Sequence, residues 1–251
     1  MLVHEFVGSN KPVMVLVHGM LTPWQIWMPQ IESFKKRYNI YVIALNAHTE
    51  ESLSEFVSVQ AEADEIVWLL KKRGIDRIDV ICGISLGGKI VHEIWKSGKI
   101  KILNLIIDGA PLVKCPKLAV NIMINNYKSI IHKSKLRDAK IIENYKKYFL
   151  PEKYLESYLK IADLITDKSI ENMVNSVFEG GELQGVNNQS RILFIHGTKG
   201  NELLSKKSAK MMKRYYPGTK IVCFKGDAHC YKVIYQPERW IKVVNDFLQN
   251  K

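Results

Sequence analysis

The stretch CGISLGGK, residues 82–89, places a single serine, Ser85, among three glycines between two apolar runs. A glycine inside a regular element costs roughly 0.5–1 kcal/mol relative to alanine, so this density of glycine indicates a backbone constraint that outweighs propensity. Gly83 and Gly87 stand two residues before and two residues after the serine. If a strand turns sharply into a helix at Ser85, both positions need very small residues, because larger side chains would collide with the strand or the helix.

Strand-like and helix-like segments alternate on both sides of this stretch. Short runs rich in β-branched residues are typical of strands buried on both faces, and apolar residues at helical spacing follow them. Such alternation predicts an α/β fold with a mostly parallel central sheet and helices on both faces. The predicted strands are 13–17, 39–45, 78–82, 102–107, 191–195 and 221–224, and the predicted helices are 23–37, 54–72, 86–96, 203–216 and 237–249.

Residues 114–189 interrupt the alternation. They contain helical patterns at 122–131, 141–149, 152–165 and 169–177 and no convincing strand. The segment is far longer than the connections of roughly 2–6 residues that are common in α/β units. We therefore predict a core of residues 1–113 and 190–251, with residues 114–189 inserted as an all-helical cap over one edge of the sheet.

Composition narrows the class of protein further. With 251 residues and 47% hydrophobic content, the chain is long enough to bury a full core. The formal charge of +12 raises the question of a nucleic-acid partner. The lysines are scattered along the chain, and no zinc-finger, phosphate-loop or RNA-binding pattern accompanies them. We interpret the charge as a lysine-rich solvated surface and expect no nucleic-acid partner.

The cellular location is predicted from the absence of membrane-spanning and export patterns. No run of eighteen apolar residues occurs, and the first residues show no basic segment followed by an apolar one. The four cysteines form none of the close pairs that zinc or redox sites need. We expect a soluble cytoplasmic protein with reduced thiols and no metal.

The sequence GISLG, residues 83–87, follows a predicted strand and opens a predicted helix. In this context it resembles the nucleophile elbow of the α/β-hydrolase superfamily, and the order of strands and the place of the insertion extend the resemblance over nearly the whole chain. The resemblance implies a serine hydrolase, similar to esterases and lipases, with Ser85 as nucleophile. It implies a small-molecule acyl substrate and no organic or metal cofactor.

A serine hydroxyl needs a base to accept its proton and an acid to orient that base. In the superfamily the order along the chain is serine, acid, histidine, which implies His229, after the last predicted strand, as the base. The oxyanion formed from the attacked carbonyl needs hydrogen-bond donors. The resemblance implies the backbone N–H groups of Leu86, just after the nucleophile, and of Met20, after the first core strand.

The acid departs from the family pattern. The superfamily usually has an aspartate in a His-Gly-x-x-Asp context after the penultimate strand, but this chain reads HGTKG at residues 196–200. Two replacements stay open. Glu202 lies near the start of the next predicted helix, with a longer side chain. Asp108 ends the predicted strand 102–107, the position from which some members of the superfamily supply their acid.

Several alternatives also stay open. The same triad supports acyl transfer, perhydrolysis or C–C bond cleavage, and a receptor can retain it with slow turnover. Trp24 and Trp27 fit either an apolar acyl pocket or the core, and Cys230 is best interpreted as a buried bystander. The oligomeric state is not indicated. The insertion carries basic residues that suit either an anionic membrane surface, without stable insertion, or solvent: Lys128, Lys133, Lys135, Arg137, Lys140, Lys146 and Lys147.

Overall fold

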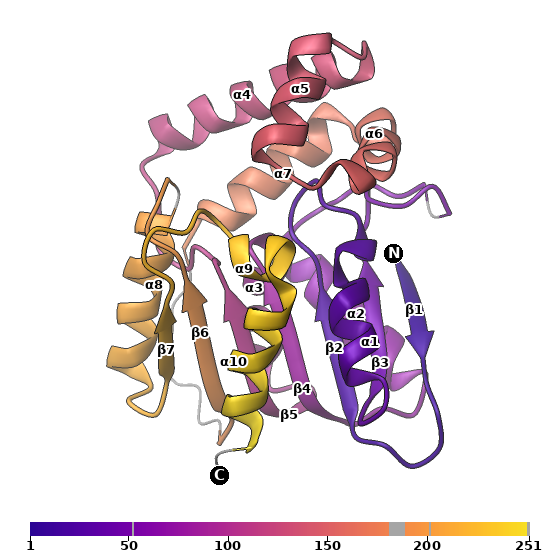
Figure 1. The fold of residues 1–251 in the computed structure, drawn as a ribbon, viewed down its shortest axis with the longest axis vertical. Coiled ribbons are helices and arrows are strands. Elements are labelled where there is room, and N and C mark those ends of the chain that lie inside the picture. Colours follow the sequence, from indigo (N-terminus) through magenta and orange to yellow (C-terminus); the bar gives the residue numbers. More distant parts are fainter. Residues whose placement is uncertain (52, 181–188, 201, 250–251) are drawn as a thin grey trace.

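The computed structural model describes the chain except for residues 52, 181–188, 201 and 250–251. In the described residues seven strands form one sheet in the order β1-β3-β2-β4-β5-β6-β7 (Figure 1). Strand β1 is antiparallel to β3, and every other neighbouring pair is parallel, which confirms the expected mostly parallel sheet. The strands are β1 (Leu2–Phe6), β2 (Val13–Val17), β3 (Asn39–Ala44), β4 (Arg77–Ile84), β5 (Lys101–Asp108), β6 (Arg191–His196) and β7 (Lys220–Cys223).

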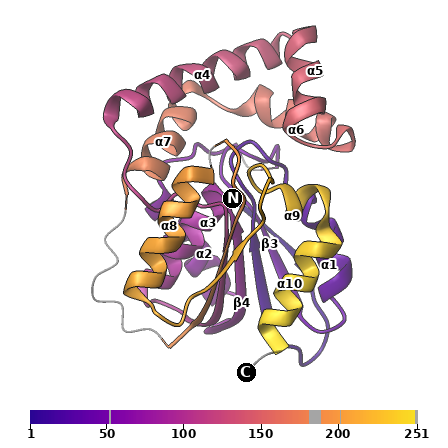
Figure 2. The same cartoon turned by 60° about the vertical axis from the view of Figure 1, so that its left-hand side comes forward.

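Helices cover both faces of the sheet, as the alternation predicts. Figure 2 shows α2 (Val59–Lys71), α3 (Leu86–Ser97) and α8 (Glu202–Tyr215) on one face, and α1 (Met28–Phe34) and α10 (Pro237–Gln249) on the other. Each layer buries large aromatic side chains against the sheet: Trp95 of α3 and Trp240 of α10 are completely buried. Burying one such side chain contributes roughly 1.5–3 kcal/mol, so these helices are held mainly by packing.

A layer of helices lies above the carboxyl ends of the parallel strands (Figures 1 and 2). Its elements are α4 (Lys117–Lys135), α5 (Ala139–Tyr148), the 3-10 turn η2 (Glu152–Tyr154), α6 (Leu155–Leu164) and α7 (Asp167–Phe178). Helix α4 packs on both α6 and α7. Residues 181–188 of the expected insertion lie outside the described residues, and the division into a core and a cap domain stays a prediction.

Two local predictions differ from the structure. The helix expected from Ser54 begins only at Val59, because Ser58 caps it: its backbone is extended and its hydroxyl accepts a hydrogen bond from the Ala61 N–H at 3.0 Å. The expected start at residue 54 was therefore wrong. The helix expected over residues 23–37 consists of the 3-10 turn η1 (Trp24–Trp27) followed by the short α1. Strand β1 and the short helix α9 (Tyr231–Tyr235) were not predicted from the sequence.

The chain packs tightly at the turn from β4 into α3. A Cβ atom on Gly83 would lie 2.3 Å from the Gly87 carbonyl oxygen, and one on Gly87 would lie 2.4 Å from the His18 carbonyl oxygen. Both distances are far below van der Waals contact with rigid backbone atoms, so only glycine fits. Between them, Ser85 has φ 51° and ψ −115°, a sparsely populated conformation for a residue with a side chain. The steric reason predicted for the two glycines is confirmed.

We predict that Gly87→Ala destabilises the protein by about 3 kcal/mol or more, because the new methyl group must displace the end of β2. In a chain of this size that lowers Tm by roughly 6–12 °C, measured by calorimetry. Gly218→Ala is the matched control, since a Cβ there meets nothing within 4 Å. Equal Tm values for the two variants would contradict the packing argument.

Candidate active site

Ser85 and His229 are brought together from opposite ends of the chain. Ser85 is the N-cap of α3, and its N–H donates to the Asp108 carbonyl oxygen at 2.8 Å, which anchors the strained turn to β5. His229 lies in the loop between β7 and α9, and its Nε2 is 2.9 Å from Ser85 Oγ. This distance is that of a hydrogen bond in which the serine hydroxyl donates to a neutral imidazole.

Glu202 lies on the other side of the imidazole ring. It is the first residue of α8 and is completely buried. One carboxylate oxygen is hydrogen-bonded to His229 Nδ1, and the other accepts from the Gly197 N–H at 2.8 Å. Because the carboxylate accepts at Nδ1, that nitrogen carries the proton and Nε2 is left as the acceptor that faces Ser85. Of the two acids left open by the sequence, the structure brings Glu202 to the histidine.

The loops that carry Glu202 and His229 are tied to each other. The N–H groups of Thr198 and Lys199 both donate to the Asp227 carbonyl oxygen at 3.0 Å. A Cβ on Gly197 would lie 2.5 Å from that same oxygen, so the two backbones are in direct contact. These contacts hold the histidine loop over the start of α8, and glycine at position 197 permits the close approach.

Asp108 lies at the end of β5 in a different environment. It is 3% exposed, and its Oδ2 accepts a hydrogen bond from Trp240 Nε1 at 3.0 Å. Burial, with the neighbouring Glu202 carboxylate as the second cause, raises the pKa of Asp108 well above its usual value. The structure thus pairs Asp108 with the indole and Glu202 with the histidine. Trp240, for which no functional signal was found in the sequence, donates the hydrogen bond to the second carboxyl group.

The two backbone groups expected to bind an oxyanion flank Ser85. Leu86 is the first residue of α3, so its N–H is among those without a partner inside the helix. Met20 belongs to a turn, residues 19–22, that lies directly against the serine: a Cβ on Gly19 would be 3.3 Å from Ser85 Cβ. Met20 and Leu86 both line the same cavity as Ser85 and His229.

This cavity has a volume of about 320 Å³ and lies between the carboxyl ends of the strands and the helices above them. Among the described residues that line it, none is a lysine, arginine, aspartate or glutamate. The polar groups are confined to Ser85, His229 and a few hydroxyl and thiol groups. The segment from α4 to α7 supplies an apolar and aromatic wall: Met123, Tyr127, Tyr148, Phe149, Leu150, Val174, Val177 and Phe178. Their arrangement suits an uncharged, mainly apolar ligand.

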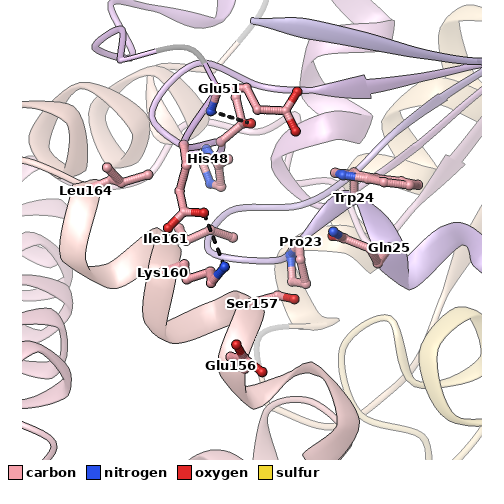
Figure 3. Close-up of a pocket in the computed structure, with 12 residues that line it drawn as sticks. Pro23, Trp24, Gln25, His48, Glu51, Glu156, Ser157, Lys160, Ile161 and Leu164 are labelled. Carbon is pink, nitrogen blue, oxygen red and sulfur yellow. Dashed lines mark hydrogen bonds and ion pairs between the residues drawn. The ribbon is translucent and has the colours of Figure 1, made fainter.

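The remaining candidate residues have structural positions. Trp27 is completely buried and packs edge-on against Trp240, so it belongs to the core. Trp24 stacks on His4 and lines a separate cavity of about 360 Å³, which lies between α6 and the residues around Trp24 and His48 (Figure 3). Cys230 is buried, its thiol lies 3.7 Å from the Asp108 carbonyl oxygen, and burial raises its pKa, so the thiol stays protonated. In the described parts of the chain, no group of three or more His, Cys, Asp or Glu side chains is arranged to hold a metal ion.

The sheet order, the serine turn and the histidine loop define the chain as a protein of the α/β-hydrolase fold. It is similar over 98% of its length to a solved structure assigned to the α/β-hydrolase family from Desulfitobacterium hafniense, which is covered completely, with 21% identity and a TM-score of 0.78. Carboxylesterase CesB from Bacillus subtilis aligns with 99% of this chain and 87% of its own, at 15% identity and a TM-score of 0.72. The structure of esterase EaEST from Exiguobacterium antarcticum aligns with 99% of this chain over 95% of its own length, at 14% identity and a TM-score of 0.75.

Sequence comparison gives a shorter match. A protein described as an uncharacterized carboxylesterase, nap, of Bacillus subtilis (strain 168) is 32% identical over 83 residues, which are 32% of this chain and 27% of that relative. The match therefore spans about a quarter of the relative's length. No protein-family model matches the chain.

The raised pKa of Asp108 predicts a pH-dependent difference in stability. A carboxyl group whose pKa is higher in the folded state stabilises the fold below its unfolded value of about 4, and this contribution is lost as the pH rises towards the folded value. Asparagine does not titrate. The free energy of unfolding of Asp108→Asn should therefore rise relative to wild type by up to about 1.4 kcal/mol per pH unit above pH 4.

Urea titrations at several pH values measure this difference. Asp163→Asn is the control of opposite sign, because hydrogen bonds from Arg137 lower the pKa of the exposed Asp163. That variant should lose stability relative to wild type as the pH rises towards about 4, and the difference should stay constant above that pH. A difference between Asp108→Asn and wild type that does not change with pH would refute the raised pKa of Asp108.

Proposed function

We propose that this protein is a serine esterase, with Ser85 as nucleophile, His229 as base and Glu202 as the acid that orients it. The observation that carries the proposal is the continuous hydrogen-bonded line from Ser85 Oγ to His229 Nε2 and from His229 Nδ1 to Glu202. A serine at neutral pH becomes a useful nucleophile only when such a base is already in place. The folds of known esterases and the short match to a carboxylesterase support the same activity.

The reaction follows from the positions of these groups. Ser85 Oγ attacks the ester carbonyl carbon while its proton passes to His229 Nε2. The carbonyl oxygen becomes an oxyanion, which the N–H groups of Met20 and Leu86 stabilise together with the N-terminal end of α3. The intermediate breaks its bond to the alcohol, which takes the proton from His229. Water then attacks the acyl group, gives its proton to the same nitrogen, and the carboxylic acid leaves as Ser85 is restored.

The cavity supports a small to medium uncharged acyl substrate. Its volume of about 320 Å³ and its apolar wall leave a charged substrate without a counter-charge from the described lining residues. The buried Val174 and the half-buried Phe178 of α7 contribute to this apolar wall. We propose that the helices of residues 114–189 act as a cap that sets acyl chain length.

Three of the seven basic residues named in the insertion form ion pairs with carboxylates. Lys128 pairs with Glu171 and Arg137 with Asp163, while Lys146 is bonded to Glu152. Neutralised in this way, these side chains favour the solvated interpretation over a membrane-binding surface. In the described part of the chain, no helix combines the length and apolar character that crossing a bilayer requires. The cytoplasmic location stays a prediction.

Labelling and turnover together test the proposed function. We predict that a fluorophosphonate probe labels the wild-type protein at Ser85 and that neutral p-nitrophenyl esters of short to medium acyl chains are hydrolysed. Ser85→Ala should lose both, because the attacking oxygen is gone. Esters with a charged acyl chain should react poorly, since the cavity offers no counter-charge. Unlabelled wild-type protein that binds esters without turnover would instead indicate a receptor, and release of acyl products other than the acid would indicate a transferase.

The two carboxyl groups should differ in their effect on rate. Glu202→Gln should lower kcat by roughly 10²–10⁴-fold with little change in KM, because glutamine cannot stabilise the imidazolium formed during attack. Asp108→Asn should stay within about tenfold of wild type, since the Asp108 side chain is hydrogen-bonded to Trp240 and not to His229. Both variants should show wild-type circular dichroism. Equal activity of the two variants would refute the assignment of Glu202 as the acid.

A further inference from the structure

The turn that carries the Met20 amide is strained. The N–H of Thr22 donates to the Gly19 carbonyl oxygen at 3.4 Å and closes residues 19–22 into a turn. Leu21, its third residue, has φ 58°, a left-handed conformation that favours glycine and is unfavourable for a branched apolar residue. Such a turn is stable only where contacts with the surrounding structure compensate for its strain.

The Leu21 amide has one distinctive partner. Its N–H donates to His48 Nε2 at 3.0 Å, and this bond is buried. His48 Nδ1 in turn donates to the Asn46 carbonyl oxygen at 2.9 Å, which gives the ring a single orientation and leaves Nε2 as an acceptor. The loop after β3 therefore supports the peptide that joins Met20 to Leu21. His48 comes from a segment that no sequence pattern connects with the site.

A second histidine supports the other end of the turn. His18 Nδ1 donates to the Gly19 carbonyl oxygen at 2.8 Å, while its Nε2 accepts from the Leu45 N–H at 3.1 Å. The rings of His18 and His48 are 5.0 Å apart. Burial lowers the pKa of His48 to about 4 and that of His18 to about 3, so both rings are neutral acceptors at pH 7. A charged ring at either position would lose its acceptor nitrogen.

We propose that His48 is a positioning residue for the oxyanion site: by accepting the Leu21 N–H, it holds the strained turn in the conformation that presents the Met20 amide to Ser85. This inference rests on the proposed function, because it assigns Met20 as a donor. Activity then requires His48 in addition to Ser85, His229 and Glu202. A displacement of an amide donor by about 1 Å is sufficient to cost up to roughly 10²-fold in rate.

The position of His48 beside a cavity allows its side chain to be replaced with little disturbance of the sheet (Figure 3). His48 lines the second cavity, between Pro23 and Trp24 on one side and Ile161 of α6 on the other. A side chain of similar size at residue 48 therefore has free volume beside it and need not disturb the sheet. Gln is the conservative replacement, since its oxygen can accept from Leu21 and its amide can donate to Asn46. Leucine has a similar volume and no acceptor.

The test compares His48→Leu, His48→Gln and the control Ser157→Ala, which alters the same cavity without touching the turn. With a p-nitrophenyl ester, His48→Leu should lose about 10- to 100-fold in kcat with KM within about threefold. Its affinity for butylboronic acid, whose tetrahedral adduct places an oxygen in the oxyanion site, should fall by the same factor. His48→Gln and Ser157→Ala should stay near wild type. A merely structural role for His48 would lower Tm and leave kcat and boronate affinity unchanged, which would overturn the proposal.

Amide hydrogen exchange of the segment containing Leu21 is a readout that does not depend on activity. Protection should be lost in His48→Leu and retained in His48→Gln, and unchanged protection in His48→Leu would overturn the proposal whatever the kinetics. Absence of fluorophosphonate labelling and ester turnover in the wild-type protein would instead contradict the proposed function. The two failures are therefore distinguishable.

Discussion

The structure depends on one close approach, that of the end of strand β4 to the first turn of helix α3. The contact leaves no room for a side chain at Gly83 or Gly87, and it forces Ser85 into a backbone conformation with φ 51°. The strain is held by burial of the surrounding strands and by the hydrogen bond from the Ser85 N–H to β5. In this conformation the Ser85 hydroxyl points away from the sheet and towards the imidazole of His229.

The other groups reach this hydroxyl through loops that hold one another. The β6–α8 loop is bonded to the β7–α9 loop through the Asp227 carbonyl oxygen, and the turn at Met20 is bonded to the loop after β3 through His48. Two carboxyl groups lie near the histidine, and their surroundings give them different states. Glu202 is bonded to the imidazole and to a backbone N–H, whereas Asp108 is buried beside an indole that donates a single hydrogen bond. A pair of acids in separate environments can thus take separate roles at one pH.

Much of this arrangement could be predicted from the sequence, and the exceptions have physical reasons. The buried parallel strands are continuous apolar runs, so the sheet and the place of Ser85 followed from local patterns. Strand β1 was missed because it is a short, half-exposed edge strand with polar residues in it. The choice between Glu202 and Asp108 could not be made, since it depends on the contact between two loops that are distant in sequence. His48 gave no signal either, because its partner is a backbone amide, which leaves no trace in residue identity.

The central claim is that Ser85 Oγ attacks the substrate. Mass spectrometry of protein quenched with acid during turnover of p-nitrophenyl acetate tests it most directly. The account predicts one acetyl group per chain, located by peptide mapping on Ser85, that disappears once the ester is consumed. An acetyl group on another residue, or rapid turnover in which no acylated protein can be trapped and Ser85→Ala remains active, would contradict it.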